Sequence, residues 1–109
     1  MKKNIKKHIQ SLKNKLDKLN VYYDDGMNWK EGVERNWCKE NTIIIDGWDC
    51  KYLVDVEDKK GEIVLNYFDL FVKGEYNVLL DKKVRQSDME HIGESNSIKK
   101  MLERINMLD

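Results

Sequence analysis

The chain has 109 residues, 40% hydrophobic and 37% charged, and its 20 basic and 20 acidic residues cancel to a net charge of zero. This length suits a single domain that folds without disulfides or metal ions, and the β-branched and aromatic content excludes a disordered chain. No apolar run approaches the roughly 18 residues of a spanning helix, and none follows the lysine-rich start. We therefore expect no membrane partner and no secretory signal, and we expect a cytoplasmic protein.

The first predicted element is a helix over residues 2–20, and Asn20 is expected to end it. Its apolar residues recur at spacings of four and three, as on one face of a helix: Ile5, Ile9, Leu12, Leu16 and Leu19. The stripe is narrow enough to be a coiled-coil seam, so a homodimer formed through it is the alternative to packing on the chain's own sheet.

A turn and a short second helix are predicted next. The sequence Asp24-Asp25-Gly26 has the chemistry of a turn. Asn28 and Glu31 have the spacing of a capping box, which predicts a helix to about residue 39, although Gly32 weakens it. Behind the box, three apolar residues recur every four positions: Trp29, Val33 and Trp37.

The middle of the chain is predicted to form an antiparallel meander. A β-branched run over residues 42–45 is closed by Asp46-Gly47, which is a hairpin signal. From Trp48 the residues alternate strictly, with Trp48, Cys50, Tyr52, Val54 and Val56 on one face and Asp49, Lys51 and Asp55 on the other. Further strands are predicted over 62–68 and 75–80, separated by a charged turn at 57–61 and a break at Lys73-Gly74.

The C-terminal part is predicted to be helical. Ser87 and Glu90 suggest a short capped turn ended by Gly93, and Ser95 or Ser97 caps a last helix. That helix has an apolar stripe: Ile98, Met101, Leu102, Ile105 and Leu108. The predicted fold is one α+β domain over 1–109, a three- to four-stranded antiparallel meander sheet covered on one face by N- and C-terminal amphipathic helices. Its outer face is expected to be wet.

The charges are unevenly distributed, because residues 1–20 hold seven lysines and one aspartate. The simplest interpretation of this basic helix is a solvated face. The alternative is nucleic-acid binding through its lysines. It would involve four residues: Lys6, Lys7, Lys13 and Lys15. Against it, the helix has neither arginine for bidentate contacts nor aromatic residues for stacking.

The acidic remainder of the chain suggests a protein partner. Carboxylates on one exposed face can imitate a phosphate backbone and occupy the groove of a nucleic-acid enzyme. The candidates for such a face are Asp46, Asp49, Asp55, Glu57 and Asp58. An acidic surface that keeps the sheet soluble is the simpler interpretation. Trp29 and Trp37 are candidate aromatic anchors for a partner, although packing on the sheet is favoured.

No catalytic or metal-binding pattern stands out. Asp46 with Glu57-Asp58-Lys59 loosely resembles a magnesium-dependent nuclease site, but the second part falls in a predicted turn, so we do not expect an enzyme. The two histidines and two cysteines have no metal-ligand spacing, and neither metal nor cofactor is expected. Reduced thiols at Cys38 and Cys50 are favoured over one disulfide between them.

Abundant lysine, asparagine and isoleucine, with no alanine or proline, indicate a low-GC genome of a bacterium or of a phage or mobile element living in one. By elimination, the sequence predicts a non-catalytic macromolecule-binding protein. The first hypothesis is a phage or mobile-element inhibitor of a host nucleic-acid-handling enzyme. The alternatives are a nucleic-acid-binding accessory protein and a protein that sequesters a small ligand in a pocket involving the tryptophans.

Overall fold

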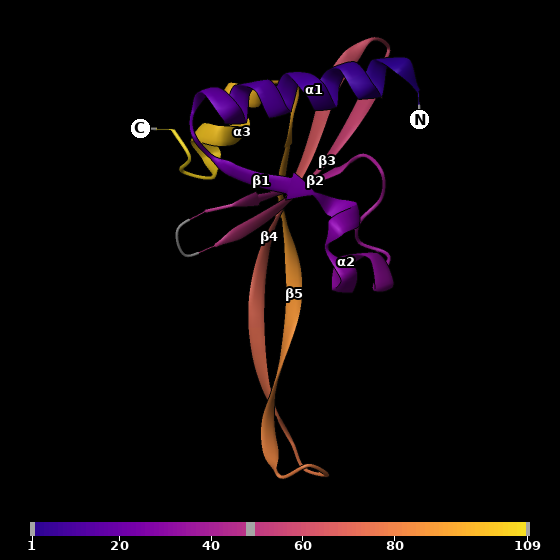
Figure 1. Cartoon of the computed structure of the whole chain (residues 1–109). Helices are drawn as coiled ribbons and strands as arrows, with labels where there is room; N and C mark the ends of the chain where they lie inside the picture. The colour runs from indigo at the N-terminus through magenta and orange to yellow at the C-terminus, as the bar shows by residue number, and fades with distance from the viewer. Residues whose placement is uncertain (1, 48–49, 109) are drawn as a thin grey trace.

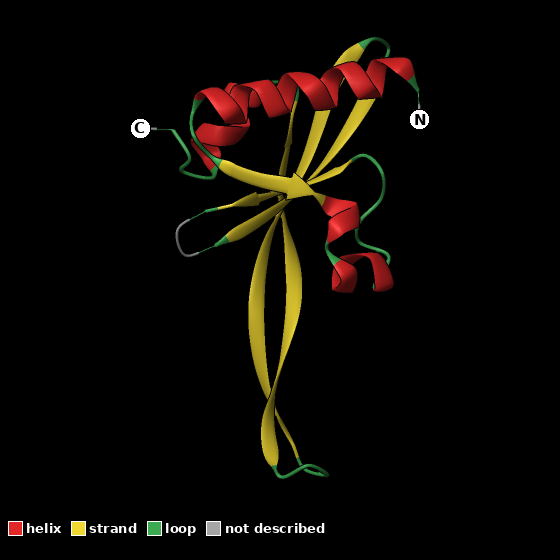
Figure 2. Ribbon diagram, in the orientation of Figure 1, coloured by secondary structure: helices red, strands yellow, loops and turns green. Residues whose placement is uncertain are grey.

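A computed structural model describes residues 2–47 and 50–108 and has an α+β fold, in which a five-stranded antiparallel sheet carries helices at both ends of the chain (Figures 1 and 2). The sheet order β1-β2-β3-β4-β5 is that of a meander, as predicted, with five strands where three or four were expected. The strands are β1 (Tyr22–Asp25), β2 (Thr42–Asp46), β3 (Lys51–Lys59), β4 (Glu62–Asn77) and β5 (Lys82–Ser95). The helical elements are α1 (Lys3–Lys18), the 3-10 turn η1 (Gly26–Asn28), α2 (Lys30–Glu34) and α3 (Ile98–Arg104).

The terminal helices α1 and α3 cover one face of the sheet, as the sequence predicts (Figure 1). Asn20 ends the first helix with a φ of 56°, a conformation that asparagine tolerates. Ser97 caps α3, because its hydroxyl accepts a hydrogen bond from the Lys100 amide at 3.3 Å. The main core lies between these helices and the sheet: Ile9, Leu12, Leu16, Ile43, Ile45, Val54, Val56, Leu65, Tyr67, Met101, Leu102 and Ile105.

The opposite face of the sheet is not uniformly exposed to solvent, which corrects the prediction of a solvent-exposed outer face. Leu53 interrupts the polar side of β3 and is 0% exposed, and a second apolar cluster forms around it. Its buried members are Cys38, Ile44, Leu53 and Leu70, and Trp29, Val33, Trp37, Phe68 and Met89 pack against them. The region around α2 therefore covers the apolar part of this face. Burial of each large apolar side chain there contributes about 2 kcal/mol to the stability of the fold.

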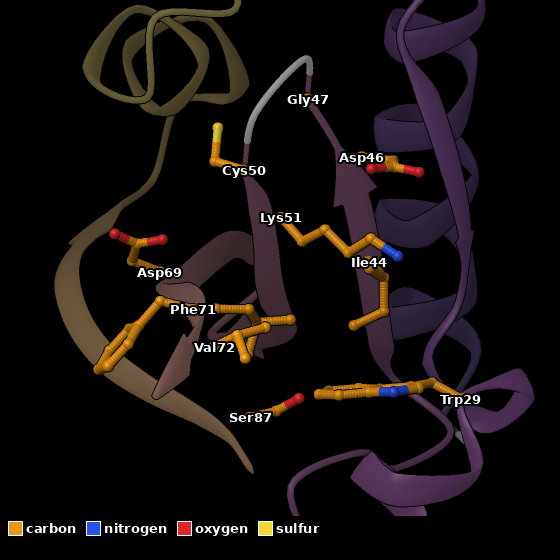
Figure 3. A pocket seen from close by; sticks show the side chains of 11 residues that line it. Trp29, Ile44, Asp46, Gly47, Cys50, Lys51, Asp69, Phe71, Val72 and Ser87 are labelled. Atoms are coloured by element: carbon orange, nitrogen blue, oxygen red, sulfur yellow. The ribbon is translucent and has the colours of Figure 1, made fainter. Parts of the chain in front are cut away.

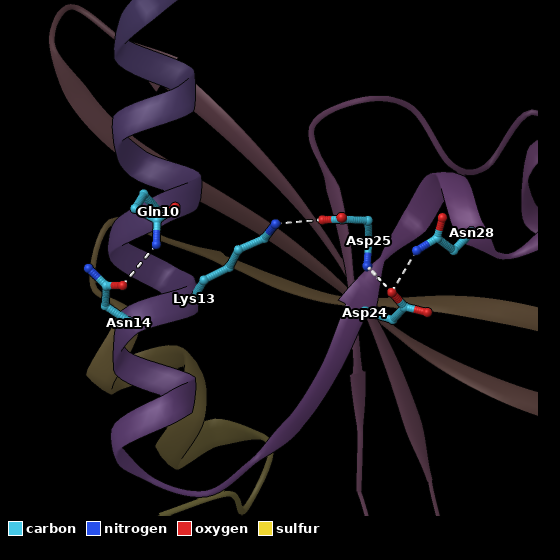
Figure 4. A network of polar contacts seen from close by, with 6 residues as sticks. All are labelled: Gln10, Lys13, Asn14, Asp24, Asp25 and Asn28. Atoms are coloured by element: carbon cyan, nitrogen blue, oxygen red, sulfur yellow. Dashed lines mark hydrogen bonds and ion pairs between the residues drawn. The ribbon is translucent and has the colours of Figure 1, made fainter.

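The segment between α1 and β2 differs from its prediction. Residues 22–25 form an edge strand rather than a turn, because their backbone pairs with β2 from Asp46 to Ile43. Asn28 caps no helix; its side-chain amide donates to Asp24 at 2.8 Å (Figure 4). The helix predicted to reach residue 39 is shorter and consists of α2 alone. Gly32 in this helix lies so close to Cys38 that a Cβ at position 32 would be 2.6 Å from the sulfur.

The hairpins also differ from their predictions. β3 continues to Lys59, so the turn narrows to Lys60-Gly61, whose φ values of 52° and 86° suit a two-residue hairpin turn. The expected break at Lys73-Gly74 is wrong, because β4 runs through it to Asn77. The expected helical turn over 87–93 is also wrong. Pairing of β5 with β4 uses those backbone groups, and this overrides the local capping signal.

The last two strands extend beyond the rest of the sheet. The pairing of β3 with β4 ends at Lys51 and Leu70, whereas β4 and β5 remain paired from Phe71 with Asp88 to Asn77 with Lys82. Residues 71–88 thus form a two-stranded ribbon, here called the arm, which projects away from the helices (Figures 1 and 2). The molecule is correspondingly elongated, with extents of 51 × 33 × 21 Å.

Candidate functional site

The arm carries most of the exposed apolar surface of the described residues. Leu79 is 95% exposed, Val78 80% and Val72 63%, and Phe71, Tyr76 and Leu80 are exposed as well. Only Tyr22 and Met27 are exposed large hydrophobic residues outside the arm, within the part of the chain that the structure describes. Sequence reasoning missed this feature because it assigned 75–80 to a strand. The available signal was a pure apolar run between Asn77 and Asp81, two residues typical of turns.

A hollow of about 680 Å³ lies at the base of the arm (Figure 3). Its apolar lining comes from several elements and includes Trp29, Ile44, Leu70 and Val72. Its polar lining includes Asp46, Lys51, Asp69 and Ser87. The edge of the Trp29 ring points toward Ser87, and the Lys51 side chain extends toward Ile44 (Figure 3). A hollow with an apolar floor and carboxylates beside it is suited to bind a ligand or side chain that presents an apolar group followed by a positive charge.

The region around α2 forms one wall of this hollow and is tied to the arm. The guanidinium of Arg35 donates to the backbone carbonyl of Ser87 in β5 and lies 4.0 Å from the centre of the Trp37 ring. Trp37 in turn packs against Trp29, with ring centres 5.9 Å apart. Both tryptophans are half-buried in the second apolar cluster, and Trp29 also lines the hollow.

The candidate acidic residues do not share one face. Asp46 is exposed beside the hollow. Asp55 is half-buried and accepts a hydrogen bond from the Thr42 hydroxyl at 2.7 Å, and burial raises the pKa of its carboxyl. Asp58 lies toward α1 instead, 2.8 Å from His8 Nε2, and this hydrogen bond lowers the pKa of Asp58. Glu57 is exposed, and Asp49 lies outside the described residues.

The loose nuclease pattern is not assembled. Asp46 pairs with Lys51 at one end of β3, and Glu57 lies six residues further along that strand. At the rise of an extended strand, these six residues separate Asp46 from Glu57 by about 20 Å. Two carboxylates that far apart cannot share a metal ion. Among residues 2–47 and 50–108, no group of three histidine, cysteine, aspartate or glutamate residues is placed to hold a metal.

The lysines of α1 are dispersed around the helix. Lys6 and Lys7 are exposed, whereas Lys13 makes a 2.7 Å ion pair with Asp25 of β1 (Figure 4). Lys13 and Lys15 lie on different sides of the helix, because two residues correspond to a rotation of about 200°. The apolar stripe of α1 is covered by the chain's own sheet.

Both cysteines are free thiols. Burial raises the pKa of Cys38 to about 11, so this thiol is protonated at neutral pH and is a poor nucleophile. The Cys50 thiol donates to the Tyr52 hydroxyl at 3.2 Å. Burial and this contact raise the pKa of Tyr52 to about 12. Cys38 therefore does not have the surroundings of an activated nucleophile.

No family model, no curated protein and no solved structure matches this chain. Within the described ranges, none of the helices combines the length and the apolar character needed to cross a bilayer.

Proposed function

We propose that this chain is a non-catalytic protein that binds another protein through the arm. The observation that supports this function is the concentration of exposed apolar side chains on residues 71–80. An isolated two-stranded ribbon is only marginally stable in water, and exposed apolar patches mark surfaces that contact other proteins. A long ribbon with exposed apolar side chains is therefore expected to bind a partner protein.

The charge of the arm favours a protein over a nucleic acid as this partner. Residues 71–88 contain four basic and three acidic residues, a net charge of +1. Binding to phosphates requires several uncompensated cations, since affinity grows with each phosphate neutralised. The acidic-face form of the inhibitor hypothesis has less support, because its carboxylates are divided between two faces and Asp55 is half-buried. An inhibitor acting through the arm remains one form of this proposal.

Site-specific cross-linking tests the function. A photoreactive residue replaces Leu79 at the arm tip, and Tyr22, which is 81% exposed outside the arm, is the matched control position. We expect a discrete cross-linked protein species from position 79 and none from position 22. Excess unlabelled wild-type chain should compete for it, whereas excess L79D should not. Equal cross-linking from both positions would contradict the proposal.

The hollow supports a second candidate function. Its volume of about 680 Å³ falls in the range of small-molecule sites, and Trp29 lines it. This is the basis for keeping the ligand-sequestering hypothesis. Titration of the intrinsic tryptophan fluorescence with nucleotides and metabolites tests it, and Trp29→Phe should remove any saturable signal.

A further inference from the structure

The arm has two outer strand edges, and the edge of β4 is open to another strand along its whole length within the described chain. Beyond Leu70, no described strand pairs with β4 on the side that β3 occupies in the body, so residues 71–77 present unpaired backbone groups there. No described strand pairs with the outer edge of β5 either, but the Ser87 carbonyl of that strand already accepts a hydrogen bond from Arg35. Open edges of this kind are templates for pairing with a further strand.

The midpoint of this free edge is Gly74. A glycine inside a strand usually marks a bulge or the close approach of another backbone. The irregularity between β4 and β5 lies at Tyr67/Phe68 and not at Gly74. A Cβ added to Gly74 would meet no heavy atom within 4 Å. Nothing within the described chain therefore requires a glycine at the centre of the edge.

Building on the proposed function, we infer that the partner of the arm is a second copy of this chain, paired antiparallel along residues 71–77 about a twofold axis at Gly74. This register places Lys73 opposite Glu75 of the second copy, and Val72 opposite Tyr76. Opposite charges and β-branched–aromatic pairs are both favourable across antiparallel strands, and the symmetry forms each pair twice. Within one copy Lys73 and Glu75 are already paired at 3.1 Å, so both side chains project from the same face of the arm.

The same register brings the arm tip to the hollow. Asn77 of the second copy lies opposite Phe71, so its Val78 reaches the start of β3, where Lys51 occupies the position opposite Leu70 and the hollow begins. A chain's own tip cannot reach its own hollow, because the eight residue steps from 70 to 78 span about 26 Å of extended strand. Lys82 and Lys83 follow the apolar tip, and Asp46 and Asp69 line the hollow together with Lys51, so the two carboxylates offer the tip lysines partners of opposite charge. The exposed apolar tip and the hollow thus fill each other in a closed dimer.

A charge-reversal series tests this register on the full-length chain. K73E places glutamates opposite glutamates, and E75K places lysines opposite lysines, whereas the double variant K73E/E75K restores both opposite pairs. Sedimentation velocity should give a wild-type dimer that each single variant weakens at least about tenfold, and the double variant should recover it. An equimolar mixture of the two single variants should form a heterodimer, because each glutamate then faces a lysine.

Three results would overturn the inference. A wild-type chain that is monomeric at 100 µM in solution excludes the second copy as partner. A dimer that neither single variant weakens excludes this edge. Weakened single variants whose mixture stays monomeric exclude the register. In the first case, a discrete cross-link from position 79 to a different protein would still support the proposed function, and loss of that cross-link as well would remove both proposals.

Discussion

The body of the molecule and its arm use the same strand in opposite ways. In the body, β4 contributes Leu65 and Tyr67, which are 0% and 2% exposed beneath the terminal helices. Past Leu70, the strand continues with Val72 and Tyr76, which are 63% and 57% exposed. The difference indicates that the buried side chains of the body supply the free energy of folding, whereas the apolar side chains of the arm stay exposed and are available for binding.

The largest expected effect concerns the body core. Leu102→Ala removes a side chain that is 0% exposed and leaves a cavity between α3 and the sheet, so we expect a loss of about 2–5 kcal/mol in the free energy of unfolding. Urea denaturation followed by circular dichroism measures it. Leu79→Ala at the arm tip is the matched control, expected to change stability by less than about 0.5 kcal/mol in dilute monomer. Equal losses in the two variants would contradict the division between body and arm.

Two glycines provide a second comparison. Gly32→Ala puts a Cβ against the Cys38 sulfur and the Trp29 ring and should cost about 1–3 kcal/mol. Gly74→Ala in the arm meets open space, and it should stabilise the monomer by about 0.5–1 kcal/mol because alanine loses less conformational entropy in a strand. Thermal unfolding of the two variants at low concentration checks the opposite signs; a destabilised Gly74→Ala monomer would mean that the arm packs against something in its own chain.

The smallest effects concern two carboxylates of the body, with opposite signs. The folded-state pKa of Asp55 is raised by burial, so its charge opposes folding above that pKa, and this opposition disappears as the pH falls. The folded-state pKa of Asp58 is lowered by His8, so its stabilising contribution is present above its ordinary pKa near 4 and is lost as the pH falls through the folded value.

The corresponding variants separate these signs. Asp55→Asn keeps an acceptor for the Thr42 hydroxyl and should match or exceed the wild-type melting temperature at pH 7, whereas Asp58→Asn should melt lower. Both differences should shrink as the pH falls below 4. A lower melting temperature for Asp55→Asn at pH 7 would show that its charge is needed in the folded body.

Most of the body could be predicted from the sequence, because its signals are periodic and local. The stripes of α1 and α3 and the alternation in β3 identify the main core directly. Leu53 was visible as an apolar residue on a polar face, but the segment that covers it depends on how the chain folds back. Edge strand β1 has no periodic signal of its own, since its pairing with β2 decides its conformation.

The arm and the hollow could not be predicted in this way. The local signals at Gly74 and at Ser87 with Glu90 suggest breaks and caps, and cross-strand pairing overrides them along β4 and β5. The acidic candidates failed to share a face because Asp58 alternates to the other side of the strand from Asp55 and Glu57. The hollow joins residues of β2, β3, β4 and β5 with Trp29, so tertiary structure alone assembles it.

Hydrogen exchange at increasing protein concentration tests whether residues 71–77 of the arm pair with a second copy of the chain. We predict that the amides of residues 71–77 that point to the free edge become at least about tenfold more protected as the chain associates, while those of Leu53 and Val54 in the body keep the same protection throughout. Arm amides that are as protected as the body in dilute solution, with no dependence on concentration, would contradict it.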